Sequence, residues 1–208
     1  MARLDGSRIA IVVAHEFEDI ELLYPTVWLS EEGASVIVAT LPQTIPGHFH
    51  PRPYFLDKPV TGRFGTTVPM LVLEEGKRYV SRLITELTLD DFDAMVFPGG
   101  FSPDYLRTHQ PTLKLVADAY RAGKVVAAIC HGPQVLISVD RRFGTDMVRG
   151  RKVTSYAAVE DDLRNAGGEF LDVGAIWEGN VVTGRCPDDL PEFCRKIADA
   201  VVAARKAG

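Results

Sequence analysis

The chain has 208 residues, of which 46% are hydrophobic and 25% are charged, and its formal net charge is -5. This balance is typical of a globular protein, and the negative charge without a basic stripe excludes a nucleic-acid binder. No segment has the roughly 18 consecutive apolar residues of a membrane span, and the N-terminus lacks a signal peptide, so we expect no membrane contact and a cytoplasmic location. The length predicts one domain over residues 1–208.

The N-terminal part of the chain predicts a strand, a helix and a second strand. Residues 8–14 form an apolar run without polar alternation, which is typical of a strand buried on both faces of a parallel sheet. Apolar residues then recur at helical spacing from Ile20 until Gly33, with Pro25 in the first turns. Residues 34–40 repeat the apolar pattern of the first strand. We therefore expect a βαβ unit with a right-handed crossover.

Residues 41–89 differ from the rest of the chain in composition. Six prolines and several glycines exclude a long helix there, and residues 68–73 and 78–83 are the best candidates for short strands. A segment of this length without regular structure is uncommon in a compact domain. We therefore interpret it as an ordered insertion after the second strand that covers a pocket or a subunit contact.

Two histidines in this insertion raise the question of a metal site. His48 and His50 alternate along the chain, so on a strand they would point the same way. No nearby acidic residue or cysteine completes a set of four ligands. We therefore interpret them as loop histidines and expect no bound metal.

Two glycines follow the next predicted strand. Residues 94–97 form a short buried strand that ends at Pro98, and Gly99 and Gly100 come directly after it. Glycines let backbone N–H groups approach a ligand closely, so this pair is a candidate oxyanion-binding site. Ser102 then has the residue type of a helix N-cap, which predicts a helix start.

Cys130 stands between a buried strand and a helix. Residues 124–129 are mostly small and β-branched apolar residues, and Gly132 and Pro133 are typical of a helix start. A side chain at such a junction lies on a sharp, often strained turn, the nucleophile elbow. The helix N-terminus also favours the thiolate form of a cysteine. The alternative interpretation is a small buried hydrophobic residue, as free cysteines often are.

The rest of the chain predicts further helices and strands. Cys186 falls in a loop and Cys194 on the last helix, and we expect both to be packing residues. Three cysteines without a CxxC pair predict neither a disulfide framework nor a zinc site. The predicted elements are helices over 111–122, 134–138, 159–165 and 190–206, a strand over 151–155, a strand pair of 169–173 with 181–183 around a turn at 178–180, and a charged loop over 141–146.

Alternating strands and helices predict the fold class. Buried strands between amphipathic helices are typical of a flavodoxin-like, doubly wound α/β sandwich with a parallel sheet. Active sites in such sheets lie at the carboxyl ends of the strands. Three connections meet at that edge, namely residues 15–21, residues 98–104 and the Cys130–His131 junction.

Four segments carry a resemblance to a known family. They run from Glu16 to Leu22, Phe97 to Gly100, Ala128 to Gln134, and Gly150 to Tyr156. In these segments the chain is similar to the ThiJ/PfpI superfamily, close to its PfpI intracellular-protease branch. The resemblance spans most of the chain outside the insertion. It implies a sandwich of the class I glutamine amidotransferase-like type and assembly into dimers or larger rings.

The resemblance assigns roles to Cys130 and Glu21. Cys130 matches the family's nucleophile, and Glu21, four residues before Pro25, matches the acid that contacts it. An ionised carboxylate would repel a thiolate, so the useful form is a protonated Glu21 that donates a hydrogen bond to the sulfur. Such a carboxyl needs a raised pKa.

His131 and Asp104 match the other members of a protease-type triad. Asp104 stands where relatives have a glutamate, so its shorter side chain leaves open whether it reaches His131 within the chain or across a subunit boundary. A histidine next to the nucleophile often points away from it. In that case His131 contributes its backbone N–H to the oxyanion hole, beside Gly100.

Relatives have been assigned peptidase, glyoxalase III and protein deglycase activities, and some act as chaperones. Our preferred prediction is a cofactor-independent cysteine enzyme that acts on reactive carbonyl compounds such as 2-oxoaldehydes. An intracellular cysteine peptidase is the first alternative. A redox-sensing or chaperone-like stress protein, in which Cys130 is oxidised to a sulfinate, is the second.

Overall fold

A seven-stranded sheet organises the structure, a computed structural model that describes residues 2–41 and 58–207. Its strand order is β10-β11-β7-β6-β1-β2-β5, and all neighbours are parallel except β10 and β11. The strands are β1 (Arg8–Val13), β2 (Ser35–Thr40), β5 (Val80–Leu83), β6 (Ala94–Phe97), β7 (Val125–Ile129), β10 (Ala175–Glu178) and β11 (Val181–Gly184).

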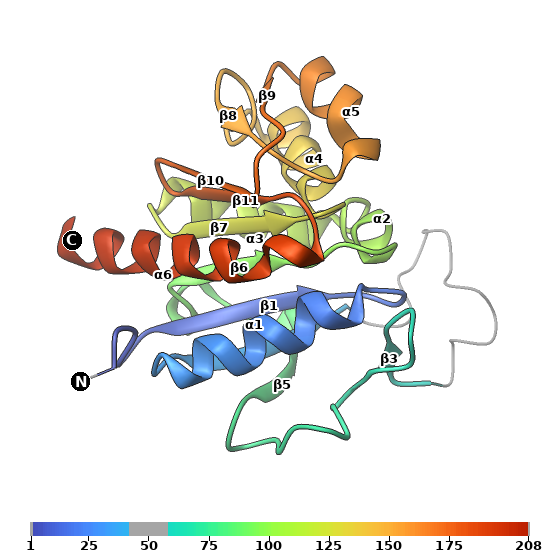
Figure 1. Ribbon diagram of the computed structural model, residues 1–208, viewed down its shortest axis with the longest axis vertical. Helices are drawn as coiled ribbons and strands as arrows, with labels where there is room; N and C mark the ends of the chain where they lie inside the picture. Colours follow the sequence, from blue (N-terminus) through green and yellow to red (C-terminus); the bar gives the residue numbers. More distant parts are fainter. Residues whose placement is uncertain (1, 42–57, 208) are drawn as a thin grey trace.

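Helices cover both faces of this sheet (Figure 1). On one face lie α1 (Asp19–Glu31) and α6 (Leu190–Ala207), which contact each other. On the other lie α2 (Ser102–Leu106), α3 (Gln110–Arg121) and α4 (Pro133–Phe143). The predicted flavodoxin-like, doubly wound α/β fold is confirmed.

Smaller elements complete the chain. The helix α5 (Glu160–Asn165) packs against α4 and beside a two-stranded sheet of β8 (Lys152–Val153) and β9 (Glu169–Phe170). A hairpin joins β3 (Val60–Thr61) and β4 (Thr67–Val68). Short 3-10 turns are η2 (Ile84–Glu86), η3 (Leu89–Asp91), η4 (Ala157–Val159) and η5 (Pro187–Asp189).

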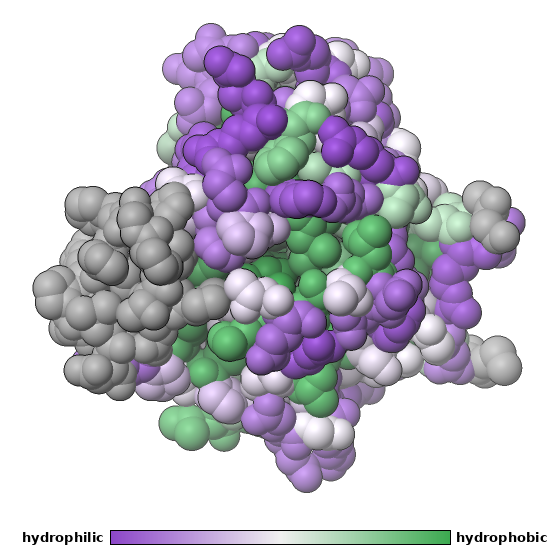
Figure 2. All heavy atoms as spheres, turned by 180° about the vertical axis from the view of Figure 1, so that it is seen from behind, coloured by the Kyte–Doolittle hydropathy of each residue, from purple (hydrophilic) through white to green (hydrophobic). Residues whose placement is uncertain are grey.

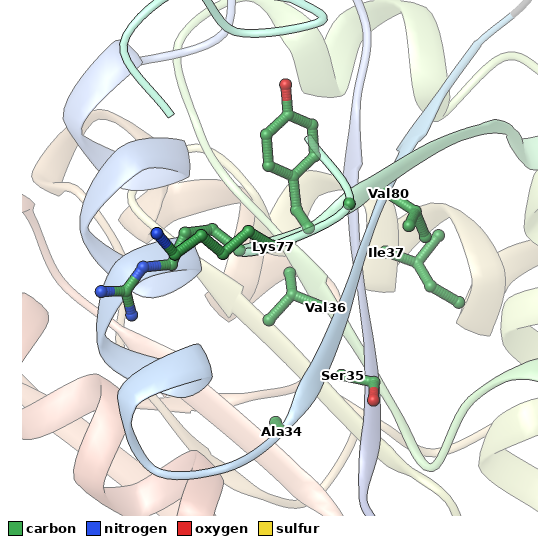
Figure 3. A pocket seen from close by; sticks show the side chains of 9 residues that line it. Ala34, Ser35, Val36, Ile37, Lys77 and Val80 are labelled. Atoms are coloured by element: carbon green, nitrogen blue, oxygen red, sulfur yellow. The ribbon is translucent and has the colours of Figure 1, made fainter. Parts of the chain in front are cut away.

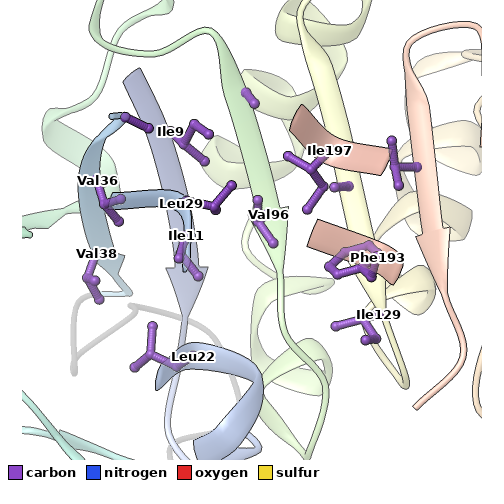
Figure 4. Close-up of a cluster of buried hydrophobic side chains, with 14 of the residues drawn as sticks. Ile9, Ile11, Leu22, Leu29, Val36, Val38, Val96, Ile129, Phe193 and Ile197 are labelled. Atoms are coloured by element: carbon purple, nitrogen blue, oxygen red, sulfur yellow. The ribbon is translucent and has the colours of Figure 1, made fainter. Parts of the chain in front are cut away.

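The core consists of two apolar layers, one on each face of the sheet. In Figure 4, Ile9 and Ile11 of β1 lie with Leu22 and Leu29 of α1 in the first layer. Ile129 of β7 lies beside Phe193 of α6 in the same layer. The strands are apolar on both faces because both faces are covered, which is what their unbroken apolar runs predict.

Three predicted local features are wrong. The supposed loop over residues 141–146 begins as the last turn of α4, which ends at Gly144 in a left-handed conformation (φ 63°). Residues 169–173 do not pair with 181–183, because a two-residue turn pairs β11 with the strand directly before it, β10. Ser102 is not an N-cap, since its hydroxyl accepts a hydrogen bond from the Ala14 N–H (2.8 Å).

Part of the predicted insertion can be compared with the structure. Of the strand predicted over 78–83, residues 80–83 form β5, which lies at the edge of the main sheet, whereas strand structure near residue 68 is limited to β4. His48 and His50 lie outside the described residues. No helix within residues 2–41 and 58–207 is long and apolar enough to cross a membrane.

The surface is mainly hydrophilic when the molecule is seen from behind, with hydrophobic residues gathered near the middle of that face (Figure 2). A hollow of about 190 Å³ lies between the start of β2 and the segment before β5, beside Ala34 and Lys77 (Figure 3). It is at the amino end of β2. The chemistry expected at Cys130 lies at the opposite edge of the sheet.

The burial pattern predicts unequal effects of two leucine truncations. Leu29→Ala removes a fully buried side chain from the layer under α1 and should lower the free energy of unfolding by about 2–5 kcal/mol. Leu71→Ala, whose side chain is 94% exposed, should change it by less than about 0.5 kcal/mol. Urea unfolding followed by circular dichroism measures both, and equal effects would contradict this core assignment.

Candidate active site

Three connections converge at the carboxyl edge of the sheet. The chain winds from β1 to β2 and β5, then returns to β6 on the other side of β1, so β1 and β6 are neighbours where the strand order reverses, the position at which open α/β sheets have their ligand crevice. Phe17, after β1, forms a bridge with Gly100, after β6. Cys130 follows the adjacent β7 (Figure 1). The sequence-predicted loops are therefore in contact.

Cys130 lies on a strained turn. Its φ is 60°, a left-handed conformation that is uncommon for a residue with a side chain. The Cys130 N–H donates to the Gly184 carbonyl (3.0 Å), and its carbonyl accepts from the Tyr156 N–H (3.0 Å). A Cβ at Gly132 would lie 2.2 Å from the Phe97 carbonyl oxygen, so only glycine fits there. Neighbouring strands and loops thus hold the strand-turn-helix junction in its strained form.

Glu21 is the buried acid of the site. Its side chain, on the first turn of α1, is fully buried, and Oε2 accepts a hydrogen bond from the Gly99 N–H (2.6 Å). Oε1 is buried without a hydrogen-bond partner of good geometry among the described residues. Burial raises the pKa of Glu21 to about 7, against the lowering effect of hydrogen bonds from Gly99 and Cys130. The predicted raised pKa agrees with this environment.

The Cys130 thiol is nearly buried and faces this carboxyl. Burial raises the pKa of the thiol, and the negative charge of Glu21 raises it further, whereas the N–H groups of His131 and Gly100 lower it. This direction is opposite to the one expected from the helix N-terminus alone. Repulsion by Glu21 acts only while Glu21 is ionised. The pKa of the thiol is raised further than that of Glu21, so the first proton to leave this pair comes from Glu21, and a thiolate forms only when the thiol proton moves to that carboxylate.

Backbone N–H groups form an anion-binding position beside the sulfur. The N–H groups of Gly100 and His131 both favour the charged sulfur. A Cβ at Gly99 would lie 2.8 Å from the Cys130 Cβ, and one at Gly100 would lie 2.4 Å from the Glu16 carbonyl oxygen. Both glycines are therefore needed for the close approach. An oxygen on a carbon attacked by the sulfur would meet these donors.

His131 directs a ring nitrogen to the nucleophile. Its Nδ1 lies 3.3 Å from the Cys130 sulfur, and its ring stacks on Tyr156 with centroids 5.2 Å apart and planes at 27°. Burial lowers the pKa of His131, and the charge of Asp104 raises it. Asp104 is thus within electrostatic range in the same chain, although no hydrogen bond joins the two residues in the described structure. The side chain of His131 does not point away from the sulfur.

Sequence reasoning gave no site role to Tyr156 or Arg63. Tyr156 ends one of the four family-like segments, so a signal for it existed. Arg63 falls in residues 41–89, where no periodicity identifies a site. Its guanidinium pairs with Glu18 (2.9 Å) at the same edge of the sheet. Within residues 2–41 and 58–207 no group of three His, Cys, Asp or Glu residues is arranged to hold a metal ion.

Comparisons with known proteins agree on one family. Residues 7–200 match the family model described as DJ-1/PfpI family. The chain is 35% identical to the deglycase PfpI of Pyrococcus furiosus over 190 residues, which cover 91% of this chain and 96% of that protein. It is 35% identical to the putative cysteine protease YraA of Bacillus subtilis over 191 residues, which cover 92% and 96%.

A solved structure supports the same relationship. It is a two-domain protein of Anabaena variabilis with DJ-1/ThiJ/PfpI-like and ferritin-like domains. The TM-score is 0.73 and the identity 31%, and the match covers 93% of this chain. The match spans 48% of that longer protein, so the likeness concerns only part of it.

The raised pKa of Glu21 predicts a pH-dependent difference in stability. A carboxyl that holds its proton more tightly in the folded state favours folding most below its ordinary pKa of 4.5, and this advantage is lost as the pH rises through about 7. The variant Glu21→Gln has no titrating group at this position and keeps its free energy of unfolding over this range, whereas the parent loses stability. The difference between variant and parent should therefore shift in favour of the variant by up to about 3 kcal/mol from pH 4.5 to pH 8.

Urea unfolding of both proteins at the two pH values measures this gain. The exposed Glu169→Gln controls for the loss of one negative charge. A difference between Glu21→Gln and the parent that stays flat with pH would show that Glu21 keeps an ordinary pKa.

Proposed function

Because this chain belongs to the DJ-1/PfpI family, we propose that it is a cysteine-dependent enzyme that acts on reactive carbonyl compounds such as 2-oxoaldehydes. Relatives named deglycase and putative cysteine protease indicate an enzyme. The observation that carries the proposal is the meeting of the Cys130 sulfur with the Glu21 carboxyl, the His131 ring and two backbone N–H groups. We expect it to work in the cytoplasm, where thiols stay reduced.

The first step is addition of the sulfur to the aldehyde. The Cys130 thiolate attacks the aldehyde carbon of the substrate, a C–S bond forms, and the carbonyl electron pair moves to oxygen. The Gly100 and His131 N–H groups stabilise this oxyanion. Before the attack the Glu21 carboxylate takes the thiol proton, so the neutral carboxyl that results does not repel the thiolate. Protonation of the oxygen completes a hemithioacetal.

A proton shift then converts the adduct to a thioester. His131 is the better base for the C–H proton of the hemithioacetal, because burial lowers its pKa and keeps the ring neutral near pH 7. The proton returns to the neighbouring carbonyl carbon through an enediol. Water hydrolyses the thioester, which releases a 2-hydroxy acid and restores the thiol. The net reaction adds one water to the oxoaldehyde and needs no metal or organic cofactor.

A peptidase is the second candidate. In a peptidase the same sulfur attacks an amide carbon and His131 protonates the leaving amine. The Nδ1 to sulfur distance of 3.3 Å favours this possibility, since it matches the geometry of a nucleophile and its acid-base partner. Asp104 would orient the imidazolium in this reaction, from the same chain or from a second copy in a homo-oligomer.

Removal of the nucleophile tests both candidates. Cys130→Ser should lower kcat/KM for methylglyoxal at least about 10³-fold, because a serine hydroxyl is far less acidic than a thiol and is a much weaker nucleophile. The half-buried Cys186→Ser is the matched control and should retain the parent's rate. Formation of lactate measures the first reaction, and a peptide library measures the second. Equal activity of Cys130→Ser and parent would exclude both enzyme assignments.

Asp104 predicts a shift in the pH profile. Its negative charge raises the pKa of His131, so Asp104→Asn should move the acid limb of kcat/KM to lower pH. The shift should be less than about half a pH unit, because Asp104 is exposed and its charge is screened. The exposed Asp161→Asn on α5 serves as control. A shift to higher pH would contradict a role for Asp104 in tuning His131.

A further inference from the structure

The β3–β4 hairpin holds Arg63 beside the site in a fixed position. At the turn, Asp19 is buried, and its two carboxylate oxygens accept the N–H groups of Phe64 (2.8 Å) and Thr66 (2.7 Å). A Cβ at Gly62 would lie 2.5 Å from the Asp19 Oδ2, so the turn packs tightly on this carboxylate. A turn anchored in this way keeps the Arg63 backbone in place.

Backbone hydrogen bonds join this hairpin to the loop after β1. The Arg63 N–H donates to the Phe17 carbonyl (3.0 Å), and the Glu16 N–H donates to the Thr61 carbonyl (2.7 Å). Phe17 is the residue that forms the bridge with Gly100. The hairpin therefore extends the loop that contacts the oxyanion donor Gly100, and Arg63 lies directly beside that loop.

The Arg63 guanidinium has donors that remain uncommitted. Its carbon lies 5.8 Å from the centre of the Phe101 ring, which directly follows Gly100, and 5.7 Å from that of Phe64. Nη1 donates to the Glu18 carboxylate (2.9 Å), and the other N–H groups have no partner among the described residues. The side chain is 44% exposed. Its charge lowers the pKa of both Glu21 and His131, so it acts on the reacting groups.

We propose that Arg63 determines substrate specificity by binding a carboxylate on the substrate. The substrate class is then a 2-oxoaldehyde that carries a carboxylate at its far end. This inference rests on the proposed function, because it assumes that Cys130 attacks the aldehyde. Two free N–H groups on one edge of a guanidinium match the two oxygens of a carboxylate.

The surroundings of Arg63 favour a singly charged group over a phosphate. At the hollow beside Arg63, the positive charges of Arg63 and Lys58 are balanced by Glu16 and Glu18, so a doubly charged group finds no excess positive charge. A hollow of about 410 Å³ beside Arg63 has room for a short chain. It is lined by Glu16, Lys58, Thr61, Gly62, Arg63, Phe64 and Gly65.

Alkylation of Cys130 tests anion binding without any turnover. Iodoacetate and iodoacetamide have nearly the same shape, but only the first carries a carboxylate. The ratio of their rates at Cys130, measured by peptide mass spectrometry, should fall about three- to tenfold in Arg63→Met. Glu18→Gln frees a further donor and should raise the ratio. Salt at 0.5 M should weaken the preference of the parent, because it screens charges.

A matched control is available on α5. Arg164 pairs with Glu160 (2.8 Å) and lies 5.4 Å from the Phe170 ring, which repeats the surroundings of Arg63 away from the crevice. Arg164→Met should leave the ratio unchanged, and the ratio at Cys186 should not respond to Arg63→Met. An unchanged ratio at Cys130 in Arg63→Met overturns the inference and leaves the proposed function intact. Failure of Cys130 to react with either reagent overturns both.

Turnover provides the second test. The probes are 4,5-dioxopentanoate, which would give 2-hydroxypentanedioate, and its neutral methyl ester. The parent should prefer the acid, and Arg63→Met should lose this preference through a higher KM for the acid with little change for the ester. Equal kcat/KM values for acid and ester in the parent overturn the assigned substrate class. Absence of turnover of both probes and of methylglyoxal overturns the proposed function and, with it, this substrate class.

Discussion

A buried carboxyl that faces a buried thiol is the constraint on which the rest of the site depends. Burial away from water disfavours the charged form of each group, and repulsion between two negative charges disfavours ionisation of both groups at once. Burial raises the pKa of Glu21 to about 7, so the carboxyl is a proton donor over much of the neutral range. The proposed nucleophile therefore needs its proton taken up by Glu21, after which a neutral acid and the backbone N–H groups of Gly100 and His131 favour the charged sulfur.

The fold supplies the rigidity that this pair needs. Cys130 keeps its left-handed conformation because β11 and the segment at Tyr156 bind its N–H and carbonyl groups. Gly99 and Gly100 permit contacts that any Cβ would prevent. These contacts come from the end of β11, the segment after β8 and the connection after β6, so the strain at one residue is held by several elements at once. The same sheet is held between two apolar layers, one on each of its faces.

The proposed chemistry and the proposed selectivity are located on different parts of the chain. The residues proposed to react follow β1, β6 and β7, where the parallel sheet determines their positions. The β3–β4 hairpin, which carries Arg63, is held by hydrogen bonds to Asp19 and to the Glu16–Phe17 loop. Sequence changes in a hairpin attached in this way can leave the position of Cys130 unchanged. Relatives of similar length and identity that are named deglycase and cysteine protease are consistent with such a division.

The sequence alone determined the parallel sheet, the elbow at Cys130 and the glycine pair, because each depends on local patterns: unbroken apolar runs, a strand that ends at a cysteine, and two glycines after a strand. It also led to Glu21, His131 and Asp104 through family-like segments. Only the tertiary structure decided that Glu21 meets the Gly99 N–H, that the His131 ring points to the sulfur, and that Arg63 stands at the crevice. These contacts depend on the order of the strands in the sheet and on the rotamers of the side chains. A local sequence pattern determines neither the strand order nor the rotamers. For the same reason the predicted partner of β11, residues 169–173, is wrong: the actual partner is β10, the strand that the turn places beside β11.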